Sequence, residues 1–171
     1  MAPEAKPSTE HLVGLPLSVV SPVDVGRLIR ELEVIDNILL QLGLRGGSSE
    51  LKLPKTSQLM DQTVELNKLN LLQATDRQQL QKLLVNVRQR APVLHISFSA
   101  DPAPAFIEKL MAWLRREIHP VVLLTIGLQP SIGAGCIVRG ISNHFDFSLR
   151  QDFLKKQELL VAMLVPEEKP A

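Results

Sequence analysis

The chain has 171 residues, of which 45% are hydrophobic and 22% charged, so it contains enough apolar material for a folded core. Nineteen Lys and Arg residues against 18 Asp and Glu residues give a formal net charge of +1, and aromatic residues make up 4% of the chain. This composition provides no broad positive field for nucleic acid or an anionic membrane, and few aromatic side chains for stacking on bases.

The first 20 residues are expected to form a flexible tail, because the start is rich in proline and lacks the pattern of a secretory signal. A helix is expected to begin at Ser21-Pro22, with Asp24 near the positive end of its dipole. Apolar residues then recur at spacings of three and four, up to an expected stop at Gly43: Val25, Leu28, Leu32, Ile35, Leu39 and Leu42. The pattern favours a helix packed within its own domain, and a coiled coil with a partner remains open.

Two more helices are predicted before Pro92. A glycine- and serine-containing connection over 44–54 precedes a helix that begins near Thr56 or Ser57. The capping-box pattern Thr75-Asp76-Arg77-Gln78 then starts a third helix, with four residues expected to be buried: Leu80, Leu83, Leu84 and Val87. Proline disfavours helical geometry at the residue before it, so a region of three helices is expected over 21–91.

An α+β domain is predicted over 92–165, followed by a tail over 166–171. Alternation through Leu94, Ile96 and Phe98 predicts a strand, and an amphipathic helix follows Pro102–Pro104. The apolar run 121–126 predicts a second strand that is buried on both faces, parallel to the first and central in the sheet. A hairpin over 136–147 and a last helix opened by the capping box Ser148-Leu149-Arg150-Gln151 complete the order β-α-β-β-β-α. The fold class is therefore α+β, an N-terminal helical region followed by a small mixed sheet covered by helices.

The segment Pro130–Arg139, followed by Asp146-Phe147-Ser148, resembles the C-terminal signature of the delta subunit of F-type ATP synthases. The mitochondrial counterpart of this subunit is the oligomycin-sensitivity-conferring protein. The family shows a proline, a pair of glycines, an apolar strand ending in arginine, a short turn, and an aspartate and serine before a helix. The matching positions are Pro130, Gly135, Arg139, Asp146 and Ser148. Together with Ser99-Ala100-Asp101-Pro102, which resembles the entry into the same domain, the resemblance covers about 93–164.

The resemblance implies a non-catalytic peripheral-stalk subunit, or stator, which links the catalytic head to the membrane-anchored stalk during proton-driven ATP synthesis. Its partners would be other synthase subunits, and its place the cytoplasmic face of the cell membrane, reached only through those partners. No cofactor, metal, nucleic acid or small-molecule substrate is expected.

The stalk contact is expected on the last helix, because its apolar residues exceed one buried stripe: Phe153, Leu159, Leu160, Met163 and Leu164. An alternative is a protein-interaction adaptor with a delta-like domain in another assembly, since the family has six N-terminal helices and this sequence predicts three.

Catalytic interpretations of the C-terminal residues are less favoured. Cys136, His144 and Asp146 could act as nucleophile, base and orienting acid only if they converged in space, and the apolar surroundings of Cys136 favour a core cysteine. The four histidines are scattered and form no zinc-binding pattern. Folding roles are expected instead: Gly135 for a close backbone approach, Asp146 for hydrogen bonds within the turn or a pair with Arg139, and Ser148 as a helix cap.

Overall fold

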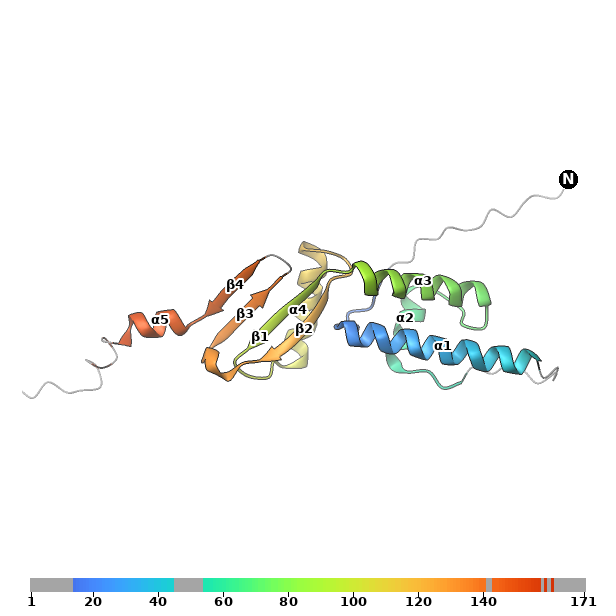
Figure 1. Cartoon of the computed structure of the whole chain (residues 1–171), viewed down its shortest axis with the longest axis horizontal. Coiled ribbons are helices and arrows are strands. Elements are labelled where there is room, and N and C mark those ends of the chain that lie inside the picture. The colour runs from blue at the N-terminus through green and yellow to red at the C-terminus, as the bar shows by residue number, and fades with distance from the viewer. Residues whose placement is uncertain (1–13, 45–53, 141–142, 158, 160, 162–171) are drawn as a thin grey trace, which may run out of the picture.

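The computed structural model describes residues 14–44, 54–140, 143–157, 159 and 161. These residues form an α+β fold in which three helices precede a four-stranded mixed sheet, as the sequence predicts (Figure 1). The helical part lies at one end of an elongated arrangement, the sheet lies in the middle, and helix α5 projects from the other end. Among the described residues, no helix combines the length and the apolar character that crossing a membrane would require.

Helix α1 spans Pro22–Leu44 and begins as predicted. The Ser21 N–H and Oγ–H donate to Asp24 Oδ2 at 2.9 and 2.8 Å, and the Asp24 N–H donates back to Ser21 Oγ at 3.2 Å. The predicted apolar positions are buried from Val25 to Leu39, but Leu42 is 39% exposed and the helix continues through Gly43. The predictions of a buried Leu42 and of a helix end at Gly43 are wrong. The helix extends beyond the residues that pack against the core, and residues 40–43 are all exposed.

Helices α2, Gln58–Leu66, and α3, Ala74–Arg90, complete the helical part. Ser57 is the N-cap of α2, and its Oγ accepts from the Met60 N–H at 3.2 Å. The predicted capping box at Thr75 is wrong, because α3 already begins at Ala74 and Asp76 instead accepts from the Asn70 N–H of the preceding turn at 2.8 Å. The α3 residues expected in the core are buried, except Leu83, which is partly exposed: Leu80, Leu84 and Val87.

The sheet has the order β2-β1-β3-β4, with bounds Val93–Phe98 for β1, Leu123–Leu128 for β2, Gly135–Arg139 for β3 and His144–Ser148 for β4. Strands β1 and β2 are parallel and are joined through α4, Pro104–Glu117, whereas β3 is antiparallel to both β1 and β4. The predicted hairpin of β3 and β4 is confirmed.

Strand β2 lies at an edge of the sheet, so the prediction of a central position is wrong. Its apolar run is buried on both faces because different helices cover them. Leu123, 1% exposed, packs in the core of the helical part, while Leu124, 0% exposed, packs in the core beneath α4. Burial on two faces therefore does not require a neighbouring strand on each side.

Residues 14–20 also differ from the sequence prediction of a flexible tail. Leu15 and Val19 are 7% and 0% exposed and belong to the core of the helical part. These apolar side chains are buried against the helices, which holds the backbone around them in place. Residues 1–13, the rest of the predicted tail, and the tail predicted over 166–171 lie outside the described residues.

Candidate interaction surface

The motif that resembles the delta family forms the turn into β3. Residues Pro130–Ile132 make one 3-10 turn, η1, which buries Ile132 at 3% exposure. Gly135 has φ of +92° and pairs with Ser148 across the hairpin. A Cβ at this position would lie 2.3 Å from the Phe147 carbonyl oxygen, so the close approach of β4 requires glycine.

Within the described residues, Asp146 bonds to the end of β4 and not to the turn between β3 and β4, where the sequence predicts its hydrogen bonds. Its Oδ1 accepts from the Ser148 N–H at 2.8 Å, and hydrogen bonds from Ser148 lower the pKa of Asp146, with His144 and Arg150 adding favourable charge. Arg139 forms no ion pair with Asp146, because Arg139 pairs with His144 in the register and Asp146 with Ile137.

Ser148 does not cap the last helix. Helix α5 spans Arg150–Lys155, its N-cap is Leu149, and no side chain makes a cap hydrogen bond there. The prediction of a cap at Ser148 is wrong because its backbone belongs to β4 and its N–H is already bonded to Asp146.

Strand β4 presents aromatic side chains that α4 does not cover. Side chains alternate along a strand, so the register with Cys136 and Val138 places Phe147 and Phe145 on the face that packs against α4. Yet these two phenylalanines are 60% and 50% exposed, with ring centroids 6.1 Å apart. The buried residues of α4 instead contact the core over β1 and β2: Ile107, Met111 and Leu114.

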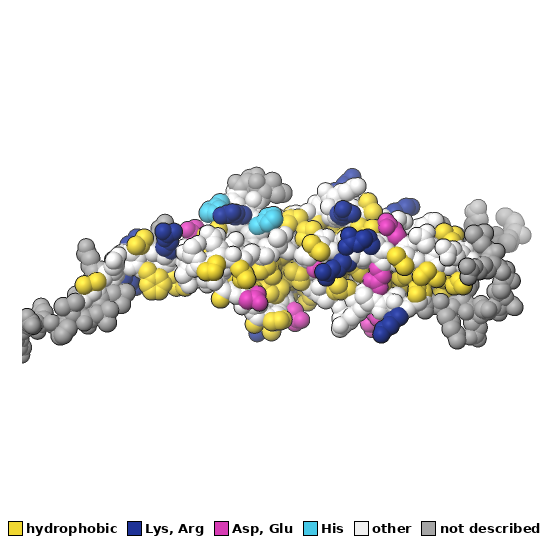
Figure 2. All heavy atoms as spheres, turned by 60° about the horizontal axis from the view of Figure 1, so that its bottom comes forward, with side chains coloured by type: hydrophobic (Ala, Val, Ile, Leu, Met, Phe, Trp, Pro, Cys, Tyr) yellow, Lys and Arg dark blue, Asp and Glu magenta, His cyan; other side chains and the backbone are white. Residues whose placement is uncertain are grey.

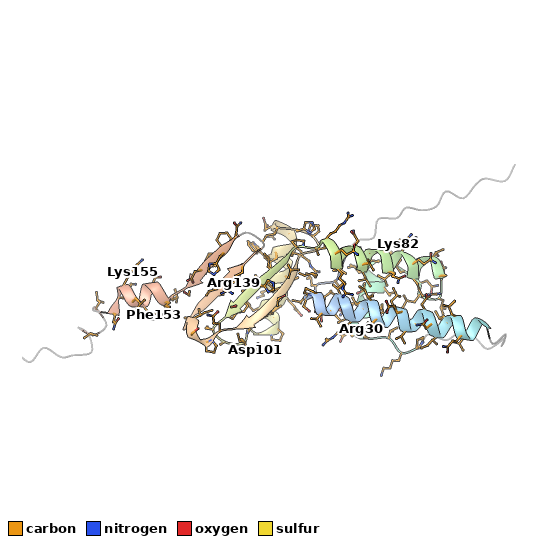
Figure 3. All side chains as sticks on the ribbon, viewed as in Figure 1. Arg30, Lys82, Asp101, Arg139, Phe153 and Lys155 are labelled. Atoms are coloured by element: carbon orange, nitrogen blue, oxygen red, sulfur yellow. The ribbon has the colours of Figure 1, made fainter. Side chains whose placement is uncertain are left out.

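Leu149 and helix α5, which follow β4 in the chain, carry further exposed apolar side chains. Leu149, Phe153 and Leu154 are 46%, 55% and 61% exposed. Figure 3 shows Phe153 and Lys155 on α5, at the end of the molecule remote from the helical part. We call these residues together with the two phenylalanines of β4 the apolar strip: Phe145, Phe147, Leu149, Phe153 and Leu154.

Of the five residues predicted to contact a partner, Phe153 is part of the apolar strip and Leu159 is 58% exposed. Leu160, Met163 and Leu164 lie outside the described residues. The exposure of Phe145 and Phe147 was not predicted, because alternation in a strand identifies a face but does not reveal whether a helix covers it.

Cys136 does not meet the residues that could make it a catalytic nucleophile. It is partly buried on the α4 face of β3, whereas alternation places His144 and Asp146 on the opposite face. Burial raises the pKa of the Cys136 thiol, which disfavours the reactive thiolate. Within the described part of the chain, no three His, Cys, Asp or Glu side chains are grouped as a metal site would need.

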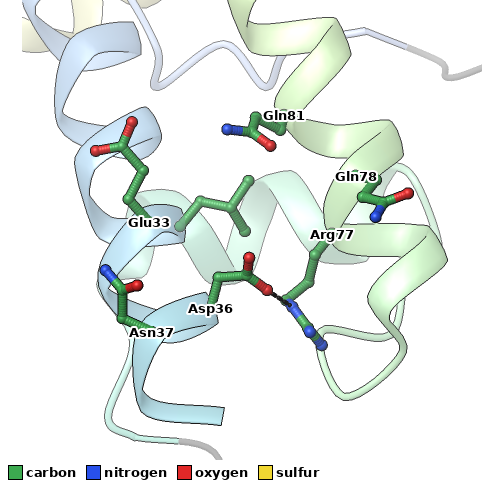
Figure 4. Close-up of a pocket in the computed structure, with 7 residues that line it drawn as sticks. Glu33, Asp36, Asn37, Arg77, Gln78 and Gln81 are labelled. Carbon is green, nitrogen blue, oxygen red and sulfur yellow. Dashed lines mark hydrogen bonds and ion pairs between the residues drawn. The ribbon is translucent and has the colours of Figure 1, made fainter. Parts of the chain in front are cut away.

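A polar pocket lies between α1 and α3 (Figure 4), and the interactions of its lining residue Arg77 serve to pack the helices together. Arg77, 8% exposed, lines it and donates from Nε to Asp36 Oδ1 at 2.6 Å. Its Nη1 donates to the carbonyls of Leu71 and Leu72 at 2.9 and 3.1 Å. Arg77 therefore holds α1 and the turn before α3 together through its Nε and Nη1 donors.

On the face drawn in Figure 2, the charged side chains of the described residues form no single patch of one sign. Figure 2 shows basic and acidic side chains dispersed among apolar ones on the face in view. The apolar strip is one set of exposed apolar residues that could bind a partner; α4 presents others, among them Phe106 and Trp113, each 49% exposed. No protein-family model matches the chain, and no curated protein is significantly similar to it.

Proposed function

We propose that this chain is a non-catalytic peripheral-stalk subunit of an F-type ATP synthase, which links the catalytic head to the membrane-anchored stalk. The sequence resemblance over about 93–164 suggests the assembly. The observation that carries the proposal is the apolar strip, which lies within the region of the resemblance. A subunit that transmits force needs lasting contacts with its neighbours and no reactive centre of its own.

The uncovered face suits a helical partner. It lies along the edge strand β4, because Cys136 and Val138 of the neighbouring β3 pack against the core beneath α4. Phe145 and Phe147 lie on this face and are half or more exposed. An amphipathic helix of the stalk could place its apolar side chains on them, as in other helix-in-groove contacts.

Contact through apolar area also agrees with the charge of the chain. A net charge of +1 provides little electrostatic attraction, so affinity would come mainly from aromatic and aliphatic side chains buried at the centre of the contact. The strip contains three phenylalanines within nine residues, Phe145, Phe147 and Phe153. Phenylalanine buries a large apolar area with few rotatable bonds, which suits a durable contact.

The experiment is a binding measurement with the soluble part of the membrane-anchored stalk subunit of the same synthase. The full chain is compared with a chain ending at Ser148, which lacks Leu149, Phe153 and Leu154, and with the double variant Phe145→Ser/Phe147→Ser. Each change should weaken binding by at least about tenfold, because truncating central apolar contacts commonly costs more than about 1.4 kcal/mol.

The matched control is Val34→Ser, which removes a side chain that is 55% exposed on α1, away from the strip. It should leave binding unchanged. Unchanged binding in both the truncated chain and the double variant would remove the assignment of the strip as the stalk contact.

The alternative is an adaptor that uses the same surface in another assembly. It is favoured by the helical part, where the described residues before Pro92 form three helices, against the six that the resemblance implies. The full chain would then fail to bind any synthase subunit, while the apolar strip would still be needed for its own partner.

A further inference from the structure

The segment Gly14–Val20, which we call the strap, contacts both the helical part and the sheet. At its start, the Asn67 Nδ2–H at the end of α2 donates to the Gly14 carbonyl at 3.0 Å, and the Gly14 N–H donates to Asn67 Oδ1 at 3.3 Å. At its end, the Val20 carbonyl accepts from the Leu124 N–H of β2 at 2.8 Å. The strap therefore bridges two parts of the fold.

The side chains of the strap are divided in the same way. Leu15 and Val19 are buried in the core of the helical part, whereas Val20 packs against the core beneath α4. Two consecutive residues thus belong to different cores. Relative movement of the helical part and the sheet would have to pull one of them out.

Arg115, in the last turn of α4, holds the middle of the strap. The strap makes a tight turn in which the Val19 N–H donates to the Pro16 carbonyl at 3.0 Å. Arg115 Nη1 donates to the carbonyls of Leu15 and Pro16 at 2.7 and 2.8 Å, and Nη2 donates to the Val19 carbonyl at 2.5 Å. One guanidinium thus binds three carbonyls that the turn brings together.

The choice of arginine follows from this geometry. A planar guanidinium can donate in several fixed directions at once, whereas a lysine ammonium is a single point of charge. The contact is costly to keep, because burial lowers the pKa of Arg115 and its Nε–H is buried without an acceptor among the described residues. The three charge-assisted hydrogen bonds offset that cost.

The strap adds to two other connections between the two parts, the chain itself and Leu123 of β2, which packs in the core of the helical part. The chain itself passes from α3 to β1 through Ala91-Pro92, a short link that would by itself allow hinge motion. We infer that the strap and Arg115 form a latch that closes this hinge, so that the helical part and the sheet move as one rigid body. The latch does not depend on which partner the apolar strip binds.

The test is amide hydrogen exchange in the full chain, comparing Arg115→Met with Arg116→Met. The neighbouring Arg116 is exposed and donates to Glu117, not to the strap, so it is a matched control. In Arg115→Met, the Leu124 and Val19 amides should exchange about tenfold to a hundredfold faster, while amides in the middle of α1, α3 and α4 keep their rates. Arg115→Lys should restore protection only in part.

Two results would overturn the inference. One is unchanged exchange at Leu124 and Val19 in Arg115→Met; the other is an equal rise throughout the chain, which would make Arg115 a general folding residue. If Arg115→Met does not fold, ¹⁵N relaxation of the unmodified chain still tests whether the helical part and the sheet move as one rigid body. A latch requires the amides of α1 and of the sheet to fit one rotational diffusion tensor, and two separate tensors would contradict it.

Discussion

Gly135→Ala is expected to destabilise the protein strongly, because it combines an unfavourable backbone angle with a collision. The φ of +92° is rarely adopted by residues with a Cβ, which costs roughly 1–3 kcal/mol. The new Cβ would lie 2.3 Å from the Phe147 carbonyl oxygen and 3.0 Å from Ser148 Cα. Both neighbours are backbone atoms of β4, so the strand itself has to shift.

The displacement of β4 adds to the cost of the angle. It strains hydrogen bonds beside Gly135, such as the one from the Leu149 N–H to the Ala134 carbonyl at 3.0 Å. Loss of one such bond costs about 1 kcal/mol, so the total is roughly 2–4 kcal/mol. For a chain of this size, each kcal/mol lowers Tm by about 2–4 °C.

Two other glycines provide controls for the same substitution. Gly133 has φ of +75°, and no atom lies within 4 Å of the place that an added Cβ would take. Gly133→Ala therefore loses only the free energy of the unfavourable backbone angle. Gly26 lies inside α1, also with free space, and Gly26→Ala should stabilise the protein by about 0.5–1 kcal/mol.

Urea unfolding of the three variants gives the comparison. Gly135→Ala should be less stable than Gly133→Ala by at least about 1 kcal/mol, because only Gly135→Ala also displaces β4 through the steric clash of its Cβ. Equal stability of these two variants would refute the argument that β4 approaches too closely for any side chain at Gly135.

Two further predictions concern ionisable groups of the hairpin. The pKa of Asp146 is lowered in the folded state, so its contribution to stability is present above its unfolded pKa of about 4 and is lost as the pH falls through the lower folded value. Asp146→Asn should remove this pH-dependent contribution to the free energy of unfolding, measured in urea between about pH 5 and about pH 2.5. A free energy of unfolding that depends on pH as in the unmodified chain would contradict the role of Asp146. Cys136 should react with a maleimide at least about tenfold more slowly in the folded chain than in urea, because it is partly buried with a raised pKa; equally fast labelling would mean that the thiol is open to solvent.

Much of the local structure could be predicted because short-range signals agree with the packing. The start of α1 follows from Ser21, Pro22 and Asp24, and its buried positions follow from apolar spacing. The hairpin of β3 and β4 follows from two apolar stretches around a polar turn. These signals act over a few residues and need no knowledge of distant contacts.

The errors arise where distant contacts decide. The position of β2 at the sheet edge depends on helices that cover both faces of Leu123 and Leu124. Residues 14–20 look tail-like in sequence, yet Arg115, about 100 residues away, binds their carbonyls. Local composition carries no information about either partner.

The candidate surface was predicted only in part for the same reason. An excess of apolar residues identified Phe153 and Leu159 as candidates, and both are exposed. Phe145 and Phe147 looked like ordinary strand residues, because the sequence does not indicate how far α4 extends over the sheet. Their exposure follows from the arrangement of α4 over β1 and β2 rather than from their own neighbours in the chain.

Purification of the tagged full chain from its own cells at native expression level tests the central claim most directly. A stator of an F-type ATP synthase should bring down both the catalytic-head subunits and the membrane-anchored stalk, in constant proportion to the chain. Recovery of a stable assembly that lacks the head subunits would contradict the proposed function and favour the adaptor.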